Sequence, residues 1–164
     1  CRSYMGDKDC ANVRRFRSKE ADGKWYWAYY DLDWSFHSKE DGPLTAILKG
    51  SGDWRIILAV LQSSQGRDAF LKRYAYLMST ILNPEYIINI IDGNVALIDS
   101  EMERDRTRWG KTYAGWQKSV EYLRNYVRDN VRTKYVLNHL QNYFKLSNEQ
   151  MDYYFGEILS KINF

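Results

Sequence analysis

The chain has 164 residues, of which 45% are hydrophobic and 27% are charged. These proportions are ordinary for a globular protein, and the length allows one hydrophobic core, so we expect residues 1–164 to form a single domain. The net charge of +3 argues against a nucleic-acid binder, and no apolar run reaches the roughly eighteen residues that a membrane span needs.

The chain begins with a loop that holds both cysteines, Cys1 and Cys10. A disulfide between them would close only a small loop, and two free thiols are the alternative, so the cysteine count leaves the redox compartment open. The two histidines, His37 and His139, are far apart and have no cysteine nearby. A zinc site is therefore not expected.

The same loop combines acidic residues with an asparagine. Asp7 and Asp9 precede Asn12 by five and three residues. In phosphoryl-transfer sites an Asp accepts the proton of the attacking hydroxyl, and an Asn a few residues later binds metal. The loop therefore suggests a phosphoryl-transfer site in which either aspartate could be the catalytic residue.

A β-hairpin is predicted next, with strands over residues 13–17 and 24–30. Residues 21–23 between them read Ala-Asp-Gly, and Asp-Gly flanked by strand-forming residues is a strong signal for a tight turn. The second strand is rich in Trp and Tyr, which suit a pleated, half-buried surface.

Two aspartates, Asp31 and Asp33, follow the aromatic strand directly. Aspartate disfavours strands, so the change in composition predicts that the strand ends here. Carboxylates at such a position suit Mg²⁺ bound together with substrate phosphates. Asp-x-Asp alone is a weak pattern, and solvated loop carboxylates, helix caps and the metal site of a glycosyltransferase are the alternatives.

A loop is predicted over residues 37–53, and from Trp54 the pattern is helical to near the C-terminus. Apolar residues at i, i+3, i+4 and i+7 predict the first amphipathic helix. Ser64 is predicted to cap the second helix, which should bury six residues. These are Phe70, Leu71, Tyr74, Leu77, Met78 and Ile81.

A third helix is predicted to begin at Asn83-Pro84-Glu85, with Asn at the N-cap, Pro at N1 and an acid in the first turn. Five of its apolar residues are expected to face inward. These are Ile87, Ile88, Ile91, Val95 and Ile98. A charged run then leads to Gly110, a predicted C-cap, and its arginines are expected to form salt bridges along a solvated face.

Thr112 is predicted to cap a long helix that breaks near Asp129 and Asn130. The helical pattern resumes over residues 131–144. A capping box at Ser147 to Gln150 predicts the last helix, over residues 148–159.

These elements predict an α+β fold that is predominantly helical, in which a short N-terminal β-hairpin precedes a helical bundle. Residues 1–36 would carry the acidic loop and the hairpin, and residues 54–164 would form the helical subdomain.

Two segments resemble the CotH family, the spore coat protein H-like atypical protein kinases of bacteria. Residues 4–17 read YMGDKDCANVRRFR, and residues 25–36 read WYWAYYDLDWSF. The Asp-Leu-Asp-Trp-x-Phe element is the most specific part. The helical region is similar as well, so the resemblance covers most of the chain.

The resemblance implies a kinase-like fold that transfers phosphate from ATP to a protein serine with Mg²⁺ or Mn²⁺. By match to the family pattern, Asp9 takes the catalytic position, Asn12 and Asp31 take metal positions, and Asp33 lies beside them. The family often has a neutral residue where this chain has Asp7, which favours Asp9 as the catalytic residue. A bacterial spore coat or exported cell-surface location is also implied.

No Gly-rich phosphate loop and no strand lysine, the parts that a kinase N-lobe supplies, precede Asp9 in this sequence. We therefore expect a C-lobe fragment that is inactive by itself and binds nucleotide weakly. Its expected partners are ATP, a protein substrate with a serine, and the missing N-terminal lobe of the same protein. A non-catalytic interaction module with a kinase-like fold, in a bacterial coat or surface assembly, is the alternative function.

Overall fold

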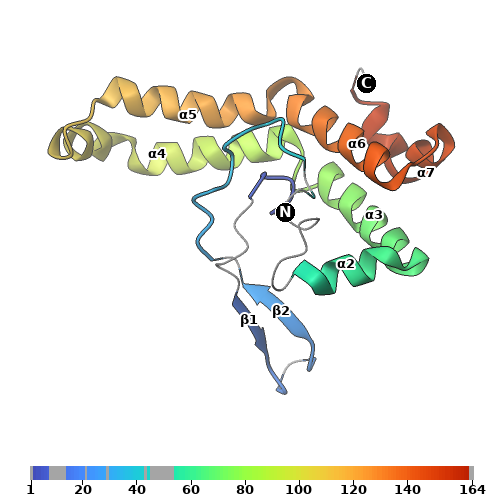
Figure 1. Cartoon of the computed structure of the whole chain (residues 1–164). Helices are drawn as coiled ribbons and strands as arrows, with labels where there is room; N and C mark the ends of the chain where they lie inside the picture. The colour runs from blue at the N-terminus through green and yellow to red at the C-terminus, as the bar shows by residue number, and fades with distance from the viewer. Residues whose placement is uncertain are drawn as a thin grey trace.

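The structure is a computed structural model, and it describes residues 2–7, 14–20, 22–28, 30–42, 44 and 54–162. Two short strands near the N-terminus precede a mostly helical remainder (Figure 1). In chain order the elements are β1 (Arg14–Arg17), β2 (Trp25–Ala28), α2 (Trp54–Gln62), α3 (Ser64–Ser79), α4 (Pro84–Arg108), α5 (Tyr113–Val127), η1 (Arg128–Asn130), α6 (Val131–Phe144) and α7 (Asn148–Leu159). The predicted fold class is confirmed, whereas a single domain over residues 1–164 stays a prediction.

β1 and β2 form an antiparallel pair in which Arg14–Arg17 lies opposite Trp25–Ala28. The turn lies where Asp-Gly predicts it. The Lys24 N–H donates to the Asp22 carboxylate over 3.0 Å, and Gly23 has a φ of +67°. Glycine adopts this conformation without steric cost. Because β1 ends at Arg17 and β2 begins at Trp25, Asp-Gly lies in a loop that is longer than a two-residue turn.

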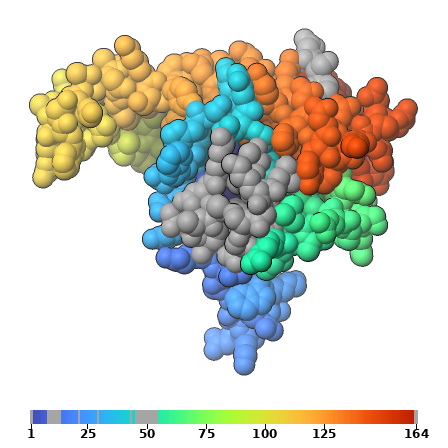
Figure 2. Space-filling view, viewed as in Figure 1, coloured from blue at the N-terminus to red at the C-terminus, as the bar shows by residue number. Residues whose placement is uncertain are grey.

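The second strand is shorter than predicted. It ends at Ala28 rather than residue 30, and residues 13 and 29 lie outside the described part of the chain. Every side chain of β1 is exposed. The hairpin protrudes from the helical body, as the blue atoms of Figure 2 show.

Side-chain caps fix where three helices begin. Asn83, Thr112 and Ser147 each accept a hydrogen bond from a backbone N–H in the first turn of their helix, as side chains of these types commonly do. The Gln150 side chain completes the capping box by accepting the Ser147 N–H over 2.9 Å. The starts of α4, α5 and α7 are therefore as predicted.

The predicted cap of α3, Ser64, is wrong by one residue. Ser63 is the cap, and its hydroxyl accepts the Gly66 N–H over 3.0 Å and donates to the Val60 carbonyl over 2.9 Å. One side chain thus serves the end of α2 and the start of α3. A Cβ at Gly66 would collide with the Val60 carbonyl, so this corner requires glycine.

Left-handed residues separate the later helices. Gly110 has a φ of +63° after α4, and the Lys111 N–H donates to the Arg106 carbonyl over 2.7 Å, which is a bond of the Schellman motif. Asp129 and Asn130 both have a φ of +57° between α5 and α6. Both predicted interruptions are confirmed.

The core lies mainly among α3, α5, α6 and α7. Its buried apolar members from these helices are Leu71, Tyr74, Ala75, Met78, Tyr126, Val127, Val136, Leu137, Leu140, Met151, Phe155 and Ile158. Of the six residues predicted to face inward from α3, Phe70 and Leu77 are only partly buried. Ile81 is exposed, so its predicted burial is wrong; it follows the end of α3, where the helical period no longer applies.

α4 and α5 form a long antiparallel pair that extends away from the other helices (Figures 1 and 2). Met102 is the buried residue of α4, and four of its five predicted core residues are half-buried. The fifth, Ile98, is 47% exposed, so that prediction is wrong. The outer part of α4 lies beyond the other helices, and α5 alone covers one side of it. The predicted salt bridges of this region include Arg104 with Glu101.

Candidate functional site

A single buried arginine anchors the N-terminal turn to α6. Arg132 has no solvent exposure. Its Nε donates to the Tyr4 carbonyl over 2.6 Å, and its Nη2 donates to the Ser3 carbonyl over 3.0 Å. Its Nη1 donates to the carbonyls of Lys39 and Asp41 over 2.7 and 2.5 Å. The guanidinium thus joins the N-terminal turn, the segment after the hairpin, and α6.

Two tyrosines flank this guanidinium. Its carbon lies 5.9 Å from the ring centroid of Tyr4 and 5.4 Å from that of Tyr126, within the range of cation–π attraction. The hydroxyls of Tyr4 and Thr133 share a hydrogen bond of 3.1 Å. Burial raises the pKa of the Tyr4 and Tyr126 phenols, against the opposing effect of the Arg132 charge, so both side chains stay neutral. We call Arg132, Tyr4, Tyr126 and Thr133 the Arg132 cluster.

Gly6 lets the N-terminal turn lie against this cluster. Its φ is +72°, and a Cβ at this position would lie 3.0 Å from the Tyr126 hydroxyl and 3.5 Å from the Ser38 carbonyl oxygen. A residue with a side chain would therefore be strained by its backbone and crowded by its neighbours.

Asp7 has a buried carboxylate within the same turn. Its side chain is inaccessible to solvent, and its Oδ2 lies 2.5 Å from Nε of Arg2. Removal of either partner from such a pair would leave a buried charge uncompensated, and the enclosed carboxylate is not open to an incoming hydroxyl. This position gives Asp7 a structural role.

The segment that follows the hairpin is joined to the N-terminal turn. The Phe36 N–H donates to the Met5 carbonyl over 2.8 Å. The Phe36 ring meets Tyr126 edge-on, with 5.1 Å between ring centroids, a favourable aromatic geometry. The segment after Asp31 and the turn before the acidic loop therefore bind each other, and both contact the Arg132 cluster.

Both aspartates of the Asp-x-Asp pattern are exposed. Asp31 has a φ of +51°, a left-handed conformation that Asp tolerates better than most residues. Asp33 lies in the turn that the Ser35 N–H closes by donating to the Leu32 carbonyl over 2.9 Å. Exposed carboxylate oxygens of this kind suit a hard cation such as Mg²⁺.

An open groove of about 710 Å³ borders Asp33. Its walls come from the segment after the hairpin and from α5. They are formed by Asp33, Ser35, Phe36, His37, Lys118, Ser119, Tyr122 and Leu123. The Tyr122 hydroxyl donates to the His37 carbonyl over 2.6 Å, and this bond holds the two walls together at one end.

The predicted catalytic residue Asp9 and the predicted metal ligand Asn12 lie outside the described residues, as do Cys1 and Cys10. Within the described part of the chain, no three His, Cys, Asp or Glu side chains are arranged to hold a metal ion. The convergence of Asp31 and Asp33 with Asp9 and Asn12 therefore stays a prediction.

The sequence interpretation missed Arg132, although a signal was present. Arg132 lies four and eight residues before Val136 and Leu140, which are both buried. Residues at this spacing share one helix face. A charged residue on an apolar stripe is almost never fully buried unless it is paired, so its position pointed to a buried polar partner.

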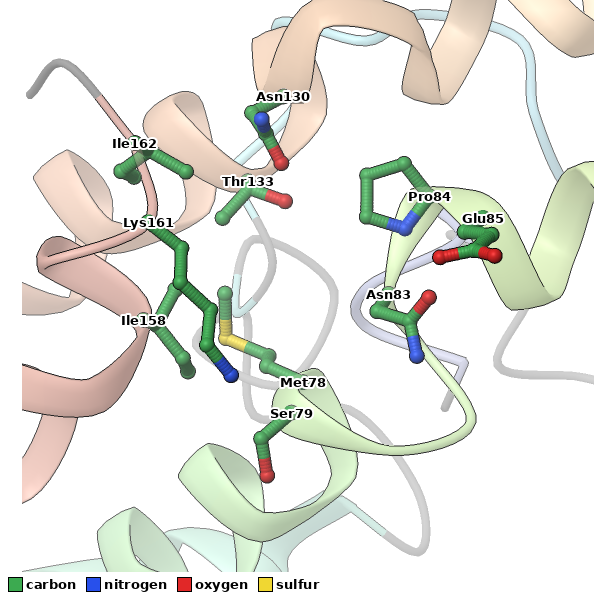
Figure 3. A pocket seen from close by; sticks show the side chains of 10 residues that line it. All are labelled: Met78, Ser79, Asn83, Pro84, Glu85, Asn130, Thr133, Ile158, Lys161 and Ile162. Carbon is green, nitrogen blue, oxygen red and sulfur yellow. The ribbon is translucent and has the colours of Figure 1, made fainter.

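A second hollow, of about 460 Å³, lies where α3, α4, α6 and α7 meet. In Figure 3, Ile158 and Lys161 line one side, and Asn83, Pro84 and Glu85 line the other. It contains none of the predicted site residues.

Comparison with known proteins gives one match. A family model described as CotH kinase protein matches residues 3–136. No curated protein and no solved structure matches the chain. None of the described helices is long and apolar enough to cross a membrane.

Proposed function

The chain belongs to the CotH kinase protein family, and from that premise we propose that it is the C-terminal lobe of an atypical protein kinase. The reaction is phosphate transfer from ATP to a serine of a protein substrate, with Mg²⁺ or Mn²⁺. The metal, when bound, neutralises the charge of the phosphates during transfer.

The observation that supports this proposal is that two segments of the chain are bound to the Arg132 cluster. The turn before the acidic loop and the segment after Asp31 are both fixed to it, through Arg132 and through the bond from the Phe36 N–H to the Met5 carbonyl. A phosphoryl-transfer site needs an Asp and an Asn of one loop beside an Asp of another segment. Holding both segments at the Arg132 cluster would favour a position of Asp9 and Asn12 close to Asp31.

The chain's own residues have the following roles in the proposal. Asp9 accepts the proton of the serine hydroxyl. Asn12 and Asp31 hold the metal, and Asp33 lies at the edge of the site. Asp7 keeps its structural role, since its carboxylate is buried against Arg2, and this supports Asp9 over Asp7.

The alternative is a non-catalytic interaction module in a bacterial coat or surface assembly. It is favoured by the exposed aromatic side chains around the hairpin, where Phe16, Trp25 and Trp34 are each more than half exposed. Exposed aromatic groups of this kind are typical of interaction surfaces.

Radiolabelled phosphate transfer tests the proposal. We expect Asp31→Ala, in the longest natural polypeptide that contains this chain, to reduce transfer to a serine-containing protein about 100-fold or more, because a metal ligand is lost. Asp22→Ala is the matched control, since Asp22 is an exposed aspartate at the hairpin turn, and it should keep full activity.

Retention of wild-type transfer by Asp31→Ala would exclude the assigned role. Absence of transfer in the unsubstituted protein, with either metal, would favour the interaction module.

A further inference from the structure

The open groove beside Asp33 lies between α5 and the segment after the hairpin. In Figure 2 the blue-to-cyan atoms of that segment lie next to the orange atoms of α5. In the proposed function Asp33 lies at the edge of the phosphate-transfer site. A polypeptide whose serine reaches that site must continue across the neighbouring surface, and this groove borders Asp33 directly.

The shape of the groove suits an extended chain rather than a small molecule. Small-molecule sites enclose most of their ligand, whereas Lys118, Ser119 and Tyr122 are all exposed along the α5 wall. Next to the opposite wall, Trp34 is 56% exposed, and its ring stacks on His37 with 5.0 Å between ring centroids. These groups offer hydroxyl and aromatic contacts to the side chains of a polypeptide.

One residue of the groove has a hydroxyl without a hydrogen-bond partner. The Ser35 oxygen is buried in the groove wall, and no group within the described residues bonds to it. Buried polar groups in native proteins are nearly always hydrogen-bonded. A main-chain group of a polypeptide in the groove would supply a partner once this side chain turns to another staggered position.

Lys118 is an unpaired cation of the groove. It forms no ion pair within the described part of the chain, although Glu121 lies one turn further along α5. Glu121 is instead bound by Arg124 and Arg128, over 3.3 and 2.5 Å, so the charge of Lys118 is available to a ligand. On the other wall Asp33 is exposed. An acidic side chain is therefore favoured near Lys118 and disfavoured near Asp33.

We propose that this groove binds the protein substrate, and that Lys118 selects substrates with Asp or Glu close in sequence to the accepting serine. The inference rests on the proposed function, which supplies the serine and the role of Asp33. It adds the substrate class, which is serines in acidic segments. Lys118 makes its contact away from the reacting atoms, so it sets specificity and takes no part in the transfer itself.

Peptide binding tests the groove without any phosphate transfer. Two fluorescent peptides carry alanine in place of the serine, flanked on both sides by glutamates in one and by lysines in the other. Fluorescence anisotropy, with the longest natural polypeptide that contains this chain, should show that the acidic peptide binds about tenfold more tightly. Lys118→Glu should weaken binding of the acidic peptide about tenfold, because an attraction becomes a repulsion.

Lys111→Glu is the matched control. Lys111 is an exposed lysine between α4 and α5 that does not line the groove, and its substitution changes the net charge by the same amount. It should leave the affinity for the acidic peptide within about twofold, since a surface charge away from the groove is largely screened at physiological salt. Circular dichroism verifies that both variants are folded.

Radiolabelled transfer to the corresponding serine peptides gives a second measurement. Lys118→Glu should raise the KM for the acidic peptide about tenfold and leave kcat nearly unchanged, because the contact is the same before and during transfer. A fall in kcat at unchanged KM would overturn the assignment of Lys118 to specificity.

The outcomes separate the groove from the reaction. Equal binding of the two peptides, or equal effects of Lys118→Glu and Lys111→Glu, would overturn the groove proposal and leave phosphate transfer unaffected. If the unsubstituted protein transfers no phosphate but its affinity for the acidic peptide still depends on Lys118, the groove is supported as a site for acidic polypeptides and the proposed reaction alone fails.

Discussion

At the scale of single residues, the most consequential side chain is Arg132. A buried guanidinium is tolerated only where its donors are satisfied. Here backbone carbonyls of Ser3, Tyr4, Lys39 and Asp41 receive them. Hydrogen bonds to a charged group contribute more than neutral ones, so this residue stabilises contacts across most of the sequence.

Replacement of Arg132 should therefore be severe. We expect Arg132→Met to lower the free energy of unfolding by about 3 kcal/mol or more, since several bonds to a charged donor are lost and buried carbonyls are left without it. Arg132→Lys should recover only part of this loss, because an ammonium group cannot reach both sides as a guanidinium fork does. Urea denaturation gives both values.

The matched control is Arg104→Met, at a highly exposed site on α4. It should change stability by less than about 0.5 kcal/mol. An Arg132→Met variant as stable as this control would mean that the network does not hold the N-terminal turn.

Gly6 is a second residue with a measurable effect. We expect Gly6→Ala to cost about 1–2 kcal/mol from its left-handed backbone alone, with an added cost from the crowded Tyr126 hydroxyl. Gly156→Ala is a suitable control, because Gly156 lies inside α7 with open space around its Cβ position. That change should stabilise the helix by about 0.5–1 kcal/mol. Thermal unfolding of the two variants should therefore shift in opposite directions.

At the scale of elements, local signals predicted most of what the structure contains. The caps at Asn83, Thr112 and Ser147 lie where side-chain chemistry places them, because a cap depends on neighbours within one turn. The Asp-Gly turn of the hairpin follows for the same reason. These features need no information from distant parts of the chain.

Features that depend on distant contacts were not predicted. Periodicity identified α4 as amphipathic but could not say that Ile98 is exposed, since this depends on how far the other helices reach along α4. The Arg132 network joins residues that are up to 129 positions apart, and its acceptors are main-chain oxygens, which leave no pattern in the sequence. The hydrogen bond from the Phe36 N–H to the Met5 carbonyl was not predicted for the same reason, because it joins distant residues through the main chain.

At the scale of the whole molecule, acid should weaken the folded state through His139. Its Nε2 is buried and has no hydrogen-bond partner within the described residues, and its ring stacks on Tyr143. Burial, assisted by the nearby charge of Arg132, lowers the pKa of His139. The folded protein therefore binds the proton less readily than the unfolded chain, whose histidine has a pKa of about 6.5.

It follows that the contribution of neutral His139 to stability is complete above about pH 6.5 and is lost as the pH falls from there toward its lower folded-state pKa. We expect urea denaturation to show a smaller loss of stability between about pH 7.5 and about pH 5.5 for His139→Gln than for the unsubstituted chain. His37→Gln, at an exposed site, should retain the full loss. Equal pH dependence in all three proteins would remove His139 as the source.

The way Arg132 holds the chain also affects which substitutions the protein can accept. Because the guanidinium contacts the main-chain oxygen of Lys39, that bond does not depend on the side chain that this exposed position carries. Lys39 can therefore change its charge and size through mutation while this bond persists. An exposed position near a candidate active site is thus free to diversify, while main-chain bonds to Arg132, Met5 and Tyr122 hold the segment around it.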